Sequence, residues 1–131
     1  MKYLIITGAV LILLAITTGW FIIAGKYLSL TVMKKIIRDE EKLIKAHVDY
    51  VIMGILLLVL FATGINLPLV VAVLACAGAL ANPSLFLFLA VKPNVNKKAG
   101  SFFGIVSTLV FLITTAGIGG AALLLIQELI Q

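Results

Sequence analysis

The sequence contains little charge, one histidine and one cysteine. Aspartate and glutamate account for five of the 131 residues and lysine and arginine for ten, while 63% of the residues are hydrophobic. A soluble domain of this length has too little interior to bury so much apolar surface. Cys76 has no partner for a disulfide or a Cys-x-x-Cys site and is expected to be a small packing residue. The chain also lacks a HExxH motif, a glycine-rich phosphate loop and a convincing hydrolytic triad.

Four apolar segments, each long enough to cross a bilayer, account for most of the chain. The first is too long for the apolar region of a typical signal peptide and is expected to remain as a helix. The sequence therefore predicts an all-α, integral membrane four-helix bundle, with residues 1–131 forming a single transmembrane domain. The helices are predicted at about 3–25, 47–65, 67–91 and 101–125, with connections at 26–46 and 92–100.

The basic residues are concentrated in two connections. Nine of the ten lie within 26–46 and 92–100, and only Lys2 lies at the other end of a helix. Because basic loops stay on the cytoplasmic side, we expect an inner (cytoplasmic) membrane protein with these connections cytoplasmic and both termini outside. The net charge of +5 then indicates contact with anionic lipid rather than nucleic acid. The 26–46 connection is predicted to be an amphipathic surface helix or a continuation of the flanking helices.

Small residues and one proline mark the third and fourth segments. The middle of the third segment is rich in alanine and glycine, which allows close helix packing. In the fourth, the spacings of Ala116 with Gly120 and of Gly117 with Ala121 predict a tight helix contact. Pro83 removes a backbone hydrogen bond and is predicted to kink the third helix. The neighbouring Asn82 needs a polar partner at membrane depth.

The candidates for chemistry lie at the start of the second segment. His47 is the only histidine, and Asp49 is the only acidic residue within the four predicted segments. Polar groups at a membrane edge are functional candidates, although a histidine there can also be simply hydrated. One histidine does not supply a multi-histidine zinc or copper site, but it is enough to hold a haem. Tyr50 shares a helical face with His47, either to bracket a planar group or to anchor the helix, whereas Asp49 is about 200° away from His47.

These residues carry a resemblance to a known group of enzymes. Ala46, His47, Asp49 and Gly54, together with Asn82, resemble the small four-helix membrane isomerases, which are the styrene oxide isomerases and the hydroxylaminobenzene mutases. The resemblance covers about residues 43–125 and implies a haem b whose ferric iron is ligated by His47. It further implies a redox-neutral rearrangement of a small hydrophobic epoxide or arylhydroxylamine, with the iron as Lewis acid. A homo-oligomer, a trimer in that group, would hold the haem near subunit contacts.

In this interpretation Asn82 and Asp49 are the catalytic polar groups, and Tyr50 accompanies His47 at the cofactor. The chain departs from the group at three positions, where Met53, Gly78 and Phe86 replace polar residues. Asn82 is also predicted about 13 Å inside its helix, whereas His47 lies at a helix edge.

Three alternatives remain open. One is a non-catalytic haem or electron-transfer module, in which Met53 of a neighbouring subunit supplies a sixth iron ligand. The others are a small transporter and a structural membrane subunit. The first helix carries no acid and the charge bias is strong, and both observations count against a transporter.

Overall fold

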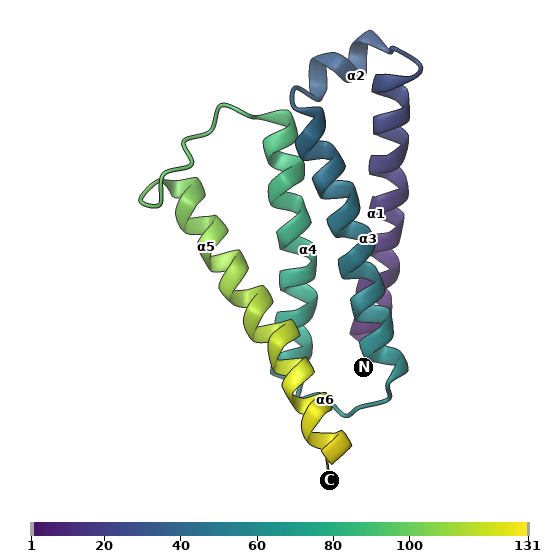
Figure 1. Cartoon of the computed structure of the whole chain (residues 1–131), viewed down its shortest axis with the longest axis vertical. Helices are drawn as coiled ribbons and strands as arrows, with labels where there is room; N and C mark the ends of the chain where they lie inside the picture. The colour runs from purple at the N-terminus through teal and green to yellow at the C-terminus, as the bar shows by residue number, and fades with distance from the viewer. Residues whose placement is uncertain (1, 131) are drawn as a thin grey trace.

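The computed structural model describes residues 2–130 as a bundle of long helices (Figure 1). Four helical stretches are long and apolar enough to cross a membrane, and the last of them contains a π-helical turn. This confirms the predicted all-α four-helix membrane fold. The elements are α1 (Lys2–Lys26), α2 (Thr31–Ile36), α3 (Glu40–Ala62), α4 (Leu69–Val91), α5 (Phe102–Thr114), η1 (Thr115–Gly119) and α6 (Gly120–Ile130).

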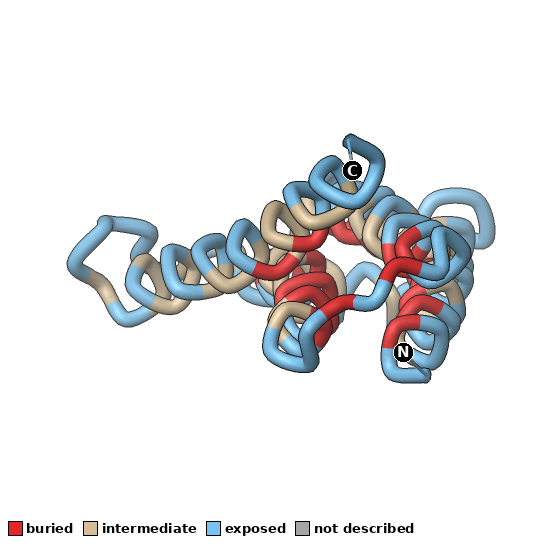
Figure 2. The backbone as a smooth tube through the Cα atoms, turned by 90° about the horizontal axis from the view of Figure 1, so that it is seen from below, coloured by how far each residue is buried: buried red, intermediate tan, exposed pale blue. Residues whose placement is uncertain are grey.

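The bundle has a basic end and an end that carries both termini. The α1–α3 and α4–α5 connections lie at one end, and the N- and C-termini lie at the other (Figure 1). Helix α1 packs against α3, α3 against α4, and α4 against the α5–η1–α6 stretch. Seen along the bundle, buried residues face the middle, and α5 runs outward from the other helices (Figure 2). The α5 helix therefore has α4 as its main neighbour.

Helix α3 begins seven residues before its predicted start at 47. The Asp39 side chain accepts a hydrogen bond from the Lys42 backbone N–H at 3.1 Å and so caps the helix. Glu41 and Lys45, one turn apart, form an ion pair at 2.8 Å. The 26–46 connection is thus divided between the short α2 and an extension of α3.

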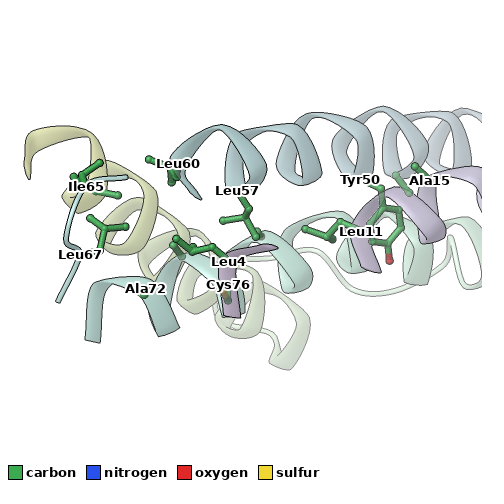
Figure 3. Close-up of a cluster of buried hydrophobic side chains, with 14 residues drawn as sticks. Leu4, Leu11, Ala15, Tyr50, Leu57, Leu60, Ile65, Leu67, Ala72 and Cys76 are labelled. Atoms are coloured by element: carbon green, nitrogen blue, oxygen red, sulfur yellow. The ribbon is translucent and has the colours of Figure 1, made fainter. Parts of the chain in front are cut away.

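The core and the outer surface are both apolar, as expected for a bundle in lipid. Leu4, Leu11 and Leu57 are fully buried and belong to a cluster shared by α1, α3 and α4 (Figure 3). Helices α1 and α3 come close where Gly8 and Gly54 meet, because a Cβ on Gly54 would lie 3.2 Å from the Gly8 carbonyl oxygen. Large apolar side chains on the outside are exposed to the surroundings, which in a bilayer are lipid tails.

The contact between α4 and the last helix is made by small residues, as predicted. Gly117 packs directly on the α4 backbone at Ala75, and Ala121 is fully buried. The other predicted pair does not form the contact in the same way, because Ala116 is exposed. The structure also shows that α4 continues through Pro83 as one helix, which agrees with the predicted helix at about 67–91.

Candidate functional site

His47 is held by helix α1 through one ring nitrogen. Its Nδ1 lies 2.8 Å from the Ala15 carbonyl oxygen and 3.3 Å from the Thr18 hydroxyl. A carbonyl oxygen only accepts hydrogen bonds, so Nδ1–H donates to Ala15. Thr18 already directs its hydroxyl to the backbone oxygens of Leu14 and Ala15, each at 2.9 Å. The ring is therefore fixed in a tautomer with the proton on Nδ1.

This arrangement leaves the other ring nitrogen of His47 available. In the neutral ring, Nε2 keeps a lone pair, and no residue within 2–130 gives it a hydrogen bond. Gly19 allows the ring to lie close to α1, because a Cβ there would be 3.2 Å from His47 Cε1. A metal-ligating histidine typically donates its second N–H to a carbonyl or carboxylate, which fixes the ring. Nε2 of His47 is thus the ring nitrogen through which a metal would bind.

Asp49 and Asn82 form a second polar contact, between α3 and α4. The Asn82 side-chain amide donates to Asp49 Oδ2 at 3.2 Å. Asp49 lies nine residues from the start of α3, and Asn82 lies nine residues from the end of α4. The hydrogen bond between them shows that Asp49 and Asn82 lie at the same level of the bundle. The pair supplies a carboxylate and an amide between α3 and α4.

Tyr50 belongs to the core rather than to the outer surface. Its side chain is buried in the same cluster as Leu11 and Ala15 (Figure 3). Its hydroxyl lies 3.0 Å from the Ser84 hydroxyl, which donates to the Leu80 carbonyl at 2.7 Å. Tyr50 thus links α3 to α4 through its hydroxyl. Met53, one turn after Asp49, is partly buried against the same core.

Within one chain, the structure does not bring His47 together with Asn82. His47 faces α1, whereas Asp49 is on the α4 side of α3. Asn82 lies one turn after Gly78, and Gly78 packs on α5, where a Cβ would be 2.5 Å from Thr114 Cα. The Asp49–Asn82 pair is therefore near the α5 side of the bundle. The candidate residues form two sites on different faces of α3.

Two of the departures from the isomerase group have structural reasons. Gly78 sits where only glycine allows α5 to approach, so an acidic side chain does not fit in this packing. Phe86 is partly buried against the core cluster. The groups that position the side chains of His47 and Tyr50 were not predicted from the sequence. The Ala15 carbonyl is a backbone group and leaves no sequence signal, whereas Gly19 and Ser84 are small residues inside apolar helices.

Comparison with known proteins identified no relative of this chain. No protein-family model, curated protein or solved structure matches the chain.

The Asp49–Asn82 contact should contribute measurably to stability. Asn82→Ala removes the donor from a carboxylate in the membrane, and the expected loss is about 1–3 kcal/mol of unfolding free energy. Unfolding in mixed detergent micelles measures this loss.

Two further variants serve as controls. Asp49→Asn keeps a hydrogen-bonding partner for Asn82 and should lower the unfolding free energy by less. If the two residues interact, Asp49→Ala combined with Asn82→Ala should cost less than the sum of the single changes. If the losses in unfolding free energy simply add, the hydrogen bond between Asp49 and Asn82 contributes nothing to stability.

Proposed function

We propose that this protein is a membrane haem b protein in which His47 ligates the iron, and that it catalyses a redox-neutral rearrangement of a small hydrophobic substrate. The observation that carries the proposal is the fixed Nδ1–H of His47, 2.8 Å from the Ala15 oxygen, together with the free Nε2. A membrane protein with one histidine can hold haem through a single side chain. The resemblance to the four-helix isomerases supports the rearrangement.

The residues around His47 suit this group. Ala15 orients the ring, and Gly19 keeps the space beside Cε1 clear of a side chain. When bound, ferric haem supplies a Lewis acid for a substrate oxygen. Asp49 and Asn82 supply an acceptor and a donor that can orient a polar substrate group. The surrounding apolar helices favour a hydrophobic substrate that enters from the bilayer.

The positions of these groups favour an oligomeric site. His47 and the Asp49–Asn82 pair lie on different faces of one chain, so they meet only if unlike faces of two copies pack together. Contacts between unlike faces are heterologous, and they form a closed ring when the rotation between neighbouring copies closes. A cyclic homo-oligomer, such as the trimer that the resemblance implies, would place Asn82 of one subunit opposite His47 of the next.

The test is an absorption spectrum of the detergent-purified protein, oxidised and reduced, with a pyridine haemochrome assay. We expect a Soret band and about one haem per chain. A ferric spectrum with an open coordination position supports the isomerase, and epoxides and arylhydroxylamines should then be screened as substrates. Reversible six-coordinate spectra would favour the electron-transfer alternative. A colourless protein, expressed with ample haem, would contradict the proposal.

A further inference from the structure

An apolar cavity opens between the C-terminal part of α4 and the start of α5. Its volume is about 380 Å³. Phe88 and Phe103 both line it, and their rings stack on each other with their centroids 5.9 Å apart. The α5 helix leans away from α4 toward the connecting loop, so the cavity lies at the basic end of the bundle (Figure 1). Its walls also include Leu85, Val95 and Val106.

A second, basic cavity adjoins the first. It has a volume of about 290 Å³, contains Arg38 and Lys92, and shares Val95 with the apolar cavity. The backbone N–H of Arg38 donates to the Ala90 oxygen at 2.8 Å, which holds the start of α3 beside the end of α4. The Lys92 ammonium lies 5.8 Å from the centre of the Phe88 ring, which lines the apolar cavity. The cationic and apolar surfaces therefore meet at Phe88 and Val95.

The two cations of this cavity have no protein counterion. Across residues 2–130 the ion pairs are Lys26 with Glu40 and Lys45 with Glu41. Asp39, the acid next to Arg38 in sequence, accepts from the Lys42 backbone instead. Two unpaired cations next to an apolar cavity complement a ligand that has an anionic end and a hydrocarbon end.

We infer that this pair of cavities binds one anionic phospholipid, with its phosphate on Arg38 and Lys92 and an acyl chain between α4 and α5. Basic pockets between membrane helices recognise anionic head groups, and arginine binds phosphate through two parallel hydrogen bonds. A free phosphate would leave the apolar cavity unfilled, and a neutral lipid would leave the two cations unpaired. This site is separate from His47.

The test uses the full chain purified in a neutral detergent, with bound lipid counted by native mass spectrometry. Phosphatidylglycerol should bind more tightly than phosphatidylcholine of the same chain length. Arg38→Gln combined with Lys92→Gln should weaken phosphatidylglycerol binding roughly thirtyfold, as expected for two cations near an anionic head group. Lys34→Gln combined with Lys35→Gln removes the same charge from α2 and should have little effect.

A further variant tests the apolar part of the site. Val106→Trp places a large side chain in the cavity and should weaken phosphatidylglycerol binding without any change in charge. Circular dichroism and gel filtration verify that each variant is folded. Equal binding of phosphatidylglycerol and phosphatidylcholine would overturn an anionic site on Arg38 and Lys92. So would an equal loss of phosphatidylglycerol binding in the Arg38/Lys92 double variant and in the Lys34/Lys35 double variant. Unchanged binding by Val106→Trp would overturn the position of the acyl chain.

Discussion

Replacing His47 with alanine should remove haem from the purified protein. Nε2 of His47 is the proposed iron ligand, and Nδ1 is already bound to the Ala15 oxygen. Loss of a group that only orients a metal ligand commonly weakens metal binding about 10- to 100-fold. Removal of the ligand itself should have a larger effect, seen as loss of the Soret band and of haem in the pyridine haemochrome assay.

Two matched measurements separate ligation from folding. Thr18→Val removes the hydroxyl 3.3 Å from Nδ1 but leaves the hydrogen bond to Ala15, so this variant should keep its haem. Added imidazole should restore the Soret band of His47→Ala, because it replaces the missing ring. Asn82→Ala should also keep haem, since Asn82 contacts Asp49 and not His47. A His47→Ala protein with full haem content would show that another residue holds the iron.

The long helices were predictable because their lengths follow from membrane thickness. At 1.5 Å per residue, an apolar run of about 20 residues crosses the hydrocarbon core, and each predicted segment has that length. The start of α3 was not predictable from hydropathy. Residues 40–46 are largely charged, yet the Asp39 cap and the Glu41–Lys45 pair make them helical. Asp49 therefore lies in the third turn of α3 rather than at its start.

Which residues contact His47 and Tyr50 depends on which faces of the helices pack together. The residues near His47 and Tyr50 in the sequence do not determine that packing. His47 stood out as an ionisable residue in an apolar chain, but its partner is a backbone oxygen 32 residues earlier. Tyr50 shares a helical face with His47, yet packing between α3 and α4 draws its hydroxyl to Ser84. Pro83 lies inside α4, as it does in the predicted helix at 67–91.

The second large effect is expected at Gly117, where the last helix meets α4. A Cβ at this position would collide with the backbone of Leu74 and would lie 2.6 Å from Ala75 Cα. Backbone cannot move aside as the end of a side chain can, so the helices must separate. Gly117→Ala should therefore lower the unfolding free energy by about 1–3 kcal/mol, the usual range for overpacking. Unfolding in mixed detergent micelles measures the change.

Gly119 offers the matched control within the same π-helical turn. Nothing lies within 4 Å of a Cβ built there, so Gly119→Ala adds the same methyl group without a collision. Because alanine loses less backbone entropy than glycine on folding, this variant should gain about 0.5–1 kcal/mol. The two substitutions should thus change stability in opposite directions, although they are two residues apart. Equal stability of the two variants would contradict the direct contact between Gly117 and α4, and with it the packing that places the last helix against Ala75.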